Sequence, residues 1–469
     1  MKILICNPNT NREVRNQAGP LGNTVAICPP LGIGYVTAVL LQAGHDARMY
    51  DFFGSSPGSI EAAIRDERPD LVGVSCFTEH RGAALEVARL ARKVDPGIHV
   101  MFGGSHASFF PGQMLEHYPE LDSIVLYEAE DTLPRWVEHV EQGREPASAP
   151  PGVAFRGSDG VVIKDRCPFI AELDGLPYPV REVENEPPYK AYPPGFALGS
   201  QSTMMATRGC PYRCQFCSTT RYWGSKYRLR GVESVADEME FLVTEKKEEF
   251  IQFFDDAMTA KKPWILGLCK EIVRRNLRVH WEAITRANYV DEEICEAMYR
   301  AGCRTVVFGI ESFSDRILKT IHKGITGAQA IQGIRAARNA GLHAGCLLMV
   351  GNHGESWETI KDSMSGIRAA RPDDIDVCLT AVFPQTELYG MATEAGLLDD
   401  SYWLDESLSA PVYTVEHSIE TLLKFRDALY DANWANNRLV QVYRALGLRK
   451  LRHLIFPTGK AGSRERYQT

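Results

Sequence analysis

The sequence predicts an α/β protein in which a doubly wound, Rossmann-like sheet precedes a partial (β/α)6 barrel. Two observations lead to this prediction. Over residues 1–145, short and continuously apolar runs alternate with helical patterns, as buried parallel strands and their crossover helices do. After a Pro- and Gly-rich stretch at 146–200, which we interpret as a linker, the alternation resumes over 201–385.

The expected strands of the first region are the apolar runs "KILICN", "DARMYDF", "DLVGVSCFT", "HVMFGGSHAS" and "SIVLYEAED". Helical patterns such as "GIGYVTAVLLQAG" and "GAALEVARLARKV" separate them. In open parallel sheets, ligands bind beyond the carboxyl ends of the strands. A binding edge is therefore expected at "SCFTEHRG", "GGSHAS" and "YEAED".

The expected strands of the second region are "STMMATRG", "EFIQFFDD", "RVHWEAITR", "TVVFGIES", "HAGCLLMVG" and "DIDVCLTAVF". Such units make an incomplete barrel, whose functional groups gather at the carboxyl ends of the strands. The remaining residues, 386–469, are mixed and mostly helical, and we expect them to close the mouth of the barrel.

Composition narrows the possible partners and location. The chain has 469 residues, of which 44% are apolar, and its formal net charge is −8. The basic cluster at 444–454 is interpreted as a solvated amphipathic helix in preference to a nucleic-acid contact. The amino terminus lacks the apolar segment of a secretory signal, and no apolar run has the length of a membrane span. We expect a cytoplasmic protein with neither a nucleic acid nor a membrane as partner.

The stretch "GCPYRCQFC" places Cys210, Cys214 and Cys217 in the spacing C-x3-C-x2-C. A disulfide is disfavoured in a reducing compartment, and structural zinc sites use four protein ligands. The other cysteines are scattered singly, several of them inside apolar patterns that predict buried thiols. Three thiolates on a [4Fe–4S] cluster would leave one iron open to a small molecule. Gly209 and Pro211 suit a tightly wrapped loop.

This motif, at the end of the first barrel strand, resembles the cluster loop of the radical S-adenosylmethionine (SAM) superfamily. The resemblance implies that the three cysteines hold a [4Fe–4S] cluster whose open iron binds SAM. It also implies SAM or cluster contacts in the loop and at the other strand ends, namely at Tyr212, Phe216, Asp255, Asp256, Arg286, Gly309, Glu311, Ser312 and Val350. The alternative for Arg286 and Glu311 is that they pair with each other inside the barrel.

An open sheet ahead of such a barrel resembles the cobalamin-binding members of the superfamily. The resemblance implies cobalamin contacts at Ser75, Thr78, Gly103, Gly104, Ser105, Tyr127 and Glu128. The sequence lacks Asp-x-His-x-x-Gly, so Arg81 is the candidate at the lower face of the cobalt and for a catalytic role, with a surface residue as the alternative. "GGSHAS" and "YEAED" depart from the usual family pattern, which has Pro after the two glycines and Gly-Glu-Gly-Glu.

Together the resemblances imply a cobalamin-dependent radical SAM methyltransferase. Such an enzyme moves a methyl group from SAM, by way of methylcobalamin, to a carbon of a small substrate, with aromatic molecules among the candidates. An external one-electron donor such as flavodoxin or ferredoxin is implied as a partner. The alternatives are a cyclase, oxidase or rearrangement enzyme with the same cofactors and, more remotely, a cobalamin sensor. Tyr389, Tyr402, Trp403 and Tyr413 are candidates for an aromatic substrate site, with core packing as the other interpretation.

Overall fold

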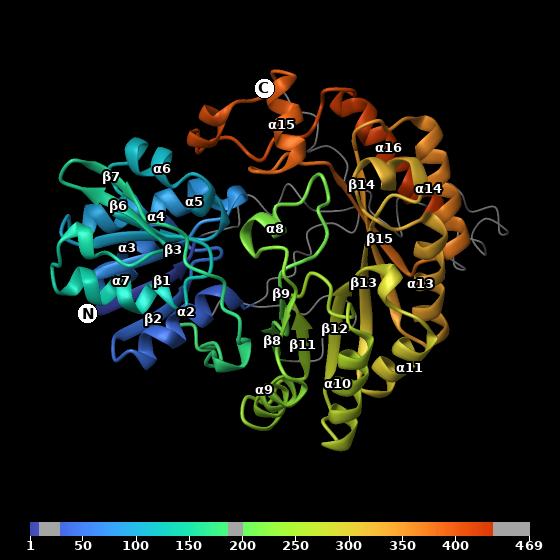
Figure 1. Cartoon of the computed structure of the whole chain (residues 1–469), viewed down its shortest axis with the longest axis horizontal. Coiled ribbons are helices and arrows are strands. Elements are labelled where there is room, and N and C mark those ends of the chain that lie inside the picture. Colours follow the sequence, from blue (N-terminus) through green and yellow to red (C-terminus); the bar gives the residue numbers. More distant parts are fainter. Residues whose placement is uncertain (9–28, 186–199, 435–469) are drawn as a thin grey trace.

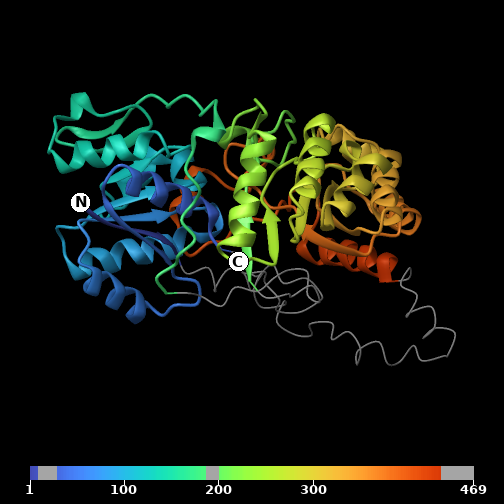
Figure 2. The same cartoon turned by 90° about the horizontal axis from the view of Figure 1, so that it is seen from below.

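The computed structural model describes residues 1–8, 29–185 and 200–434. Figure 1 shows the N-terminal sheet on one side, the barrel sheet on the other, and α15 (Glu387–Glu394) across the top between them. Seen from below in Figure 2, the N-terminal part and the barrel again lie side by side. The predicted fold class, a Rossmann-like sheet followed by a partial barrel, is confirmed. Within the described part of the chain, no helix combines the length and apolarity that crossing a membrane requires.

The N-terminal sheet has seven strands in the order β2-β1-β3-β4-β5-β6-β7. Its parallel strands are β1 (Lys2–Asn7), β2 (Asp46–Asp51), β3 (Leu71–Ser75), β4 (His99–Gly103) and β5 (Ser123–Val125). The helices of this part are α2 (Leu31–Gln42), α3 (Pro57–Glu67), α4 (Arg81–Val94), α5 (Ser105–Phe109), α6 (Pro111–His117) and α7 (Thr132–Glu141). The strands form at continuous apolar runs because side chains on both faces of the sheet are buried.

Two strands lie in the segment that we interpreted as a linker. β6 (Val153–Gly157) and β7 (Gly160–Ile163) extend the first sheet as an antiparallel hairpin next to β5. They are short and flanked by Pro and Gly, which hid them in the sequence pattern. Tertiary packing fixes their place, because the Phe155 ring centroid lies 5.0 Å from that of Trp136 in α7.

The barrel sheet has six parallel strands in the order β15-β14-β13-β12-β11-β8. They are β8 (Gln201–Met204), β11 (Phe250–Phe253), β12 (His280–Thr285), β13 (Cys303–Glu311), β14 (His343–Val350) and β15 (Asp374–Leu379). The helices of this part are α9 (Val232–Thr244), α10 (Lys262–Arg274), α11 (Glu292–Arg300), α12 (Asp315–Thr320), α13 (Gly327–Asn339) and α14 (Trp357–Ala370). Each predicted strand of this region is present.

A small ribbon follows the first barrel strand. It pairs β9 (Thr207–Arg208) with β10 (Arg228–Leu229) in antiparallel fashion. The short helix α8 (Thr219–Tyr222) lies between these two strands in sequence. Figure 1 shows α8 and β9 in the middle of the molecule, between the two sheets.

Side chains alternate between the two faces of the barrel sheet. One face packs into a large apolar core that includes Trp281 and Phe308. The other face carries Gln252 and Glu282, followed nearer the carboxyl ends by Phe254 and Leu347, which are 39% and 37% exposed. Exposed apolar side chains on an inner sheet face mark a surface that a ligand can cover.

A buried carboxyl on this inner face makes the stability of the barrel depend on pH. Burial raises the pKa of Glu282 to about 7, from the ordinary value of 4.5, although the side chain accepts a 2.9 Å hydrogen bond from Gln252. The folded protein therefore binds more protons than the unfolded chain across that window. We expect Glu282 to lower stability by about 3 kcal/mol as pH rises from 4.5 through 7, and Glu282→Gln to remove this share of the pH dependence. Thermal midpoints of the two proteins compared across this range check the prediction; parallel curves would contradict it.

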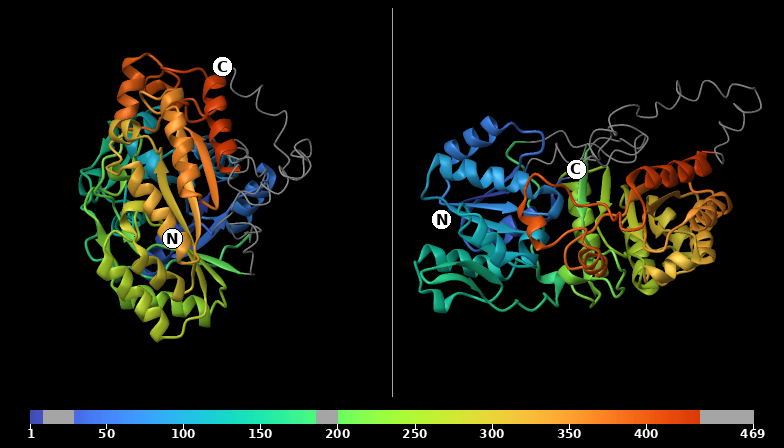
Figure 3. Two further views of the ribbon diagram at one scale, coloured as in Figure 1. Left: turned by 90° about the vertical axis from the view of Figure 1, so that its right-hand side faces the viewer. Right: turned by 90° about the horizontal axis from the view of Figure 1, so that it is seen from above.

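The C-terminal region covers one edge of the barrel sheet. α16 (Ile419–Trp434), the red helix near the C-terminal end of the described chain in Figure 3, runs beside β15. Its Tyr430 hydroxyl accepts a 3.0 Å hydrogen bond from the backbone N–H of Val377. This contact satisfies an edge donor that would otherwise be available to another strand. The basic cluster at 444–454 lies outside the described residues, so the helix predicted there stays a prediction.

A second part of the C-terminal region docks on the N-terminal sheet. The 3-10 turn η5 (Asp400–Leu404) places Trp403 in the N-terminal core, where its ring centroid lies 6.1 Å from that of Phe110 in a stacked arrangement. Nearby, Glu406 accepts hydrogen bonds from Arg89 at 2.7 and 2.8 Å. The C-terminal region therefore contacts both sheets.

The four aromatic residues considered for a substrate site belong to this docked part. Trp403 and Tyr413 are buried in the N-terminal core cluster, and Tyr389 and Tyr402 pack against the same cluster. The Tyr402 hydroxyl donates to the Ser409 oxygen at 2.7 Å. These contacts favour the core-packing interpretation for all four residues.

Candidate functional site

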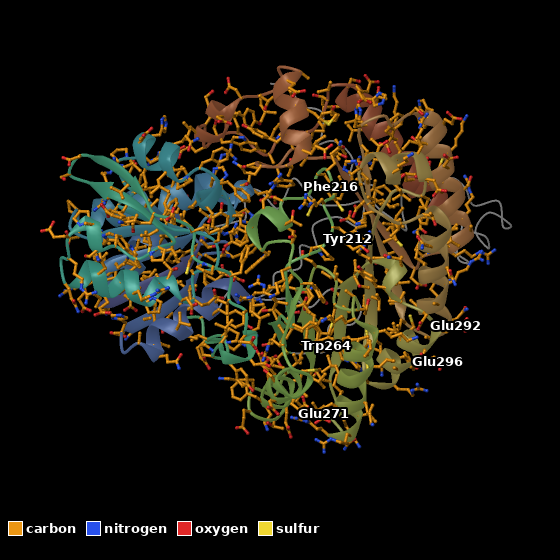
Figure 4. The ribbon with its side chains drawn as sticks, viewed as in Figure 1. Tyr212, Phe216, Trp264, Glu271, Glu292 and Glu296 are labelled. Atoms are coloured by element: carbon orange, nitrogen blue, oxygen red, sulfur yellow. The ribbon has the colours of Figure 1, made fainter. Side chains whose placement is uncertain are left out.

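The three clustered cysteines lie on a loop that follows β9. Gly209 begins the loop at φ +85°, where a Cβ would collide with the Lys226 carbonyl oxygen, so only glycine fits. The Cys210 N–H donates to the Gly224 oxygen at 3.3 Å. In Figure 4 the loop residues Tyr212 and Phe216 lie in the middle of the molecule, between the two sheets.

The chemistry of this loop fits an iron–sulfur cluster. All three cysteines are free thiols of intermediate exposure, and burial raises the pKa of Cys217 to about 11. Among the described residues, no group of three or more His, Cys, Asp or Glu side chains is placed to hold one metal ion. Thiolates that bind different irons of a cube need not converge on one point. The arrangement therefore suits a cluster better than a single zinc ion.

The two aspartates after β11 have different surroundings. Asp255 is 3% exposed, and both its carboxylate oxygens accept from the Ala206 N–H at 3.2 Å. Burial raises the pKa of Asp255 to about 7. Asp256 is exposed and accepts a 3.3 Å hydrogen bond from the Thr219 hydroxyl. Asp255 therefore braces the strand that leads to the cysteines, and Asp256 is the one available to a ligand.

Arg286 lies against the cysteine loop. Its guanidinium carbon is 3.6 Å from the ring centroid of Tyr212, and it donates to the backbone oxygen of Lys323. The Tyr289 hydroxyl donates to the Tyr212 hydroxyl at 2.7 Å, which fixes the ring in place. The Nε of Arg286 is buried without a hydrogen-bond partner among the described residues. An arginine held in this way retains donor capacity for a carboxylate.

Glu311 pairs with a residue that the sequence interpretation missed. Its carboxylate accepts from the Lys323 ammonium at 2.8 Å, and both side chains are at most 10% exposed. Glu311 therefore does not pair with Arg286, which was the alternative interpretation of the sequence. A register shift after Gly309, which lies beside the pair, leaves Glu311 at φ +67°, a strained conformation of the kind found at functional sites. A buried carboxylate requires a cation nearby. The need of Glu311 for such a partner could have pointed to Lys323 in the "HKG" turn.

Two residues predicted to contact SAM have other partners. Ser312 is buried, and its hydroxyl lies 3.1 Å from that of Ser363 in α14. The Val350 side chain belongs to the core behind the sheet. The structure therefore does not bring Ser312 or the Val350 side chain to the site, since both face the helices.

The carboxyl edge of the N-terminal sheet presents two glycines. A side chain at Gly103 would meet only the Val125 oxygen within 4 Å, at 3.8 Å. Gly104 has φ +95°, and a Cβ there would lie 2.7 Å from the Cys76 oxygen, which is too close. Backbone without side chains is what a large flat ring needs in order to approach closely.

Small and apolar side chains surround these glycines. Ser75 and Ser105 flank them at intermediate exposure, and Phe77 is 44% exposed. A flat macrocycle can cover Phe77, so this part of the sheet fits cobalamin. We call Ser75, Gly103, Gly104 and Ser105 the cobalamin edge.

Arg81 and Thr78 are interior residues. Arg81 is 2% exposed, so its alternative interpretation as a surface residue is wrong. Its guanidinium donates to the Thr78 oxygen at 2.9 Å and to the Asp405 oxygen at 2.8 Å, and it lies over the Trp403 ring. The Thr78 hydroxyl lies 3.3 Å from Nδ1 of buried His106. The C-terminal region thus holds Arg81, a contact between residues 324 positions apart that no local pattern could indicate.

Tyr127 and Glu128 belong to the contact between the two sheets. Tyr127 has φ +61°, and its ring centroid lies 3.6 Å from the Arg166 guanidinium carbon. Glu128 is buried and forms ion pairs with Arg208 and Arg228. The carboxylate predicted to contact cobalamin is therefore occupied by arginines from the ribbon next to the cysteine loop.

Gly104 offers a direct test of the cobalamin edge. Because the residue has a positive φ and no room for a Cβ, we expect Gly104→Val to disrupt the turn after β4 and to abolish retention of cobalamin. Gly44→Val is the matched control, since Gly44 also has a positive φ but has open space where the Cβ would lie. Absorbance of cobalamin after gel filtration measures the result. Equal retention by both variants would count against this edge.

Comparison with known proteins defines the class of enzyme. Residues 20–137 match the B12 binding domain family, and residues 204–366 match the radical SAM superfamily. The fold is similar to that of the radical SAM methyltransferase TsrM from Kitasatospora setae, at 21% identity and a TM-score of 0.68, over 84% of this chain and 76% of that one. The two family matches define a cobalamin-binding radical SAM enzyme, whose cofactors are cobalamin, a [4Fe–4S] cluster and SAM.

Relatives in sequence narrow the class. An uncharacterized methyltransferase of Pyrococcus horikoshii is 31% identical over 89% of this chain and 88% of its own length. Cytidylyl-2-hydroxyethylphosphonate methyltransferase of Streptomyces wedmorensis is 30% identical over 79% of this chain and 82% of its own length. An anaerobic magnesium-protoporphyrin IX monomethyl ester cyclase of Rubrivivax gelatinosus is 28% identical over 83% of this chain and 69% of its own length. The chain belongs to the cobalamin-dependent radical SAM methyltransferases.

Proposed function

We propose that this enzyme transfers the methyl group of SAM, by way of cobalamin, to a carbon of a small molecule bound between the two sheets. One observation supports the proposal above others, namely the place of the cysteine loop. Phe216 packs against the apolar cluster that the N-terminal sheet shares with α15, while the Gln215 N–H donates to the Ile321 oxygen of the barrel at 3.0 Å. Cofactors held at the loop and at the cobalamin edge would share one space.

In this proposal, the chain's own residues bind and orient the cofactors. Cobalamin and the cluster with SAM supply methyl-transfer and radical chemistry when bound. The three cysteines of the loop hold the cluster. Asp256 and Arg286 are proposed to receive the amino and carboxylate groups of SAM, because one is an exposed carboxylate and the other a braced guanidinium with a spare donor. The pair Glu311–Lys323 is proposed to shape the wall next to Arg286, which donates to the Lys323 backbone oxygen.

At the N-terminal side, the cobalamin edge would let the corrin ring approach the backbone, and Tyr127, two residues after β5, is proposed to lie beside it. Arg81, held beside Thr78, is proposed to lie next to bound cobalamin, where its cation would disfavour a nitrogen ligand to the metal. Its hydrogen bonds to two carbonyl oxygens compensate for burial and leave the guanidinium charged.

The inner face of the barrel is the proposed substrate surface. Phe254, Leu347 and Cys378 are exposed there, which makes it apolar and suited to a small molecule with a flat or aliphatic face. TsrM, whose fold is similar, has been solved with tryptophan as its substrate. An aromatic substrate is therefore among our candidates. The C-terminal region is proposed to close this space, a flavodoxin or ferredoxin to be the electron donor, and the cytoplasm to be the location.

Isotope transfer from SAM to candidate substrates tests the proposal. Holoenzyme is incubated anaerobically with SAM carrying a deuterated methyl group, a reductant and a set of small aromatic and aliphatic acceptors. We expect one acceptor to gain the intact labelled methyl group on carbon. Cyclase relatives make a cyclase the second candidate, and turnover of an acceptor without label would favour it.

A further inference from the structure

A buried group of four charged side chains joins the N-terminal sheet to the ribbon beside the cysteine loop. Glu128 and Glu130 follow β5, Arg208 lies in β9, and Arg228 lies in β10. The Arg208 guanidinium donates to the carboxylate of Glu130 at 2.5 Å and to that of Glu128 at 3.3 Å. The Arg228 guanidinium donates to both carboxylate oxygens of Glu128, at 2.7 and 2.8 Å. We name these four residues the charge clasp.

The charge clasp is shielded from water. Its side chains are 3% to 6% exposed. Aromatic rings lie beside the guanidinium groups: that of Arg208 is 5.0 Å from the Trp223 ring centroid, and that of Arg228 is 4.9 Å from the Phe169 ring centroid. Ion pairs in such surroundings lose little to salt or solvent, and removing one partner leaves a buried charge without compensation.

The ribbon of β9 and β10 cannot balance its own charge. Arg208 and Arg228 are directly opposite each other in this antiparallel pair. Like charges in that position repel, and burial strengthens the repulsion. Glu128 contacts both arginines from the other sheet. The ribbon is therefore stable in its observed form only when the N-terminal part supplies the carboxylate.

The ribbon in turn determines the position of the cysteine loop. Arg208 lies two residues before Cys210, whose N–H donates to the Gly224 oxygen ahead of β10. A displacement of the ribbon would move the first cysteine with it. On the other side, Glu128 follows Tyr127, whose N–H donates to the Ser108 hydroxyl at 2.9 Å, and that hydroxyl donates to the Gly104 oxygen of the cobalamin edge at 2.7 Å.

We propose that the charge clasp is a positioning device that fixes the cysteine loop relative to the cobalamin edge and thereby couples SAM cleavage to methyl transfer. Its four members are positioning residues, acting through the loop and the edge. The coupling part rests on the proposed function. The structural part does not, because it concerns the protein without any cofactor.

Glu128→Gln tests the charge clasp with little change in shape, because the amide has the size of the carboxylate. The matched control is Glu238→Gln. Glu238 is also a buried carboxylate paired with two arginines, Arg181 and Arg230, but it lies on α9 and its two arginines are not members of the clasp. A general effect of removing a buried carboxylate would therefore occur in both variants.

Amide hydrogen exchange of cofactor-free protein is the first readout. In Glu128→Gln we expect exchange at 126–131 and 207–217 to quicken about tenfold, since both segments lose the contact that joins them. In Glu238→Gln we expect exchange in these two segments to stay unchanged. Equal exchange in both variants would overturn the proposal.

A second variant and a second readout keep the test decisive. Arg228→Lys retains the charge but loses the Nη2 donor that bonds the Trp223 oxygen, so we expect an intermediate increase in exchange. In loaded enzyme, the ratio of 5′-deoxyadenosine to methylated product should rise severalfold in Glu128→Gln and stay constant in Glu238→Gln. An unchanged ratio in Glu128→Gln would overturn the coupling role. If the wild-type enzyme methylates nothing, the proposed function fails while the exchange result still decides the structural role.

Discussion

Replacing Cys214 with alanine is expected to remove the cluster and, with it, cleavage of SAM. Two thiolates cannot hold the cube as three do, and the cofactor carries the chemistry, so we expect formation of 5′-deoxyadenosine to fall by ~1000-fold or more. Iron content, the visible absorbance of the reconstituted protein and chromatography of the nucleoside measure the loss. Cys210→Ala and Cys217→Ala should behave in the same way, because the three thiols lie on one loop.

Cys167→Ala is the matched control for this prediction. Cys167 is also a free cysteine of intermediate exposure, and it lies in the segment after β7, outside the cysteine loop. The Cys167→Ala protein should retain the iron content and SAM cleavage of the wild type. A Cys214→Ala protein with full iron and unchanged absorbance would show that the loop does not hold the cluster.

The second large effect is expected at the buried pair of Glu311 and Lys323. Lys323→Met leaves the carboxylate of Glu311 buried without a cation, which we expect to cost about 3–5 kcal/mol of stability. Adding Glu311→Gln removes the stranded charge, so the double variant should regain most of the loss. SAM binding, measured by calorimetry, should stay weak in both, because the wall of the site has changed.

Lys262→Met is the control for the lysine change. Lys262 pairs with Asp291 at 2.5 Å and with Glu293 at 2.7 Å, but these side chains are 42% to 64% exposed, so its loss should change the thermal midpoint little. Thermal midpoints of the wild type and the three variants give the comparison. A double variant no more stable than Lys323→Met would contradict our account of the pair.

The sequence predicted the strands well because each is a buried apolar run between helical patterns. It also predicted the location of the cysteine loop, since spacing and glycine placement are local properties. β6 and β7 were missed because their short runs acquire strand structure only against Trp136 and β5. Arg81, Glu128 and Lys323 have partners that are distant along the chain or lie across a turn, and no local pattern reports them.

The structure also divides residues that the sequence grouped together. Asp255 and Asp256 are adjacent, yet one is buried against the backbone of Ala206 and the other is exposed. Glu311 and Ser312 are adjacent as well, and alternation at the strand end turns Ser312 to the helices. Motif resemblance indicates the segment that forms a site, whereas burial decides which side chain of that segment can meet a ligand.

The central claim is that this enzyme first takes a methyl group from SAM onto cobalamin. The most direct measurement needs no substrate: reduced holoenzyme is mixed with SAM carrying a deuterated methyl group, and the cobalamin is extracted and analysed by mass spectrometry. We predict a deuterated methyl group on the cobalamin and an equal amount of S-adenosylhomocysteine. Formation of 5′-deoxyadenosine and methionine alone, with unlabelled cobalamin, would contradict the claim and point to a cyclase or rearrangement enzyme.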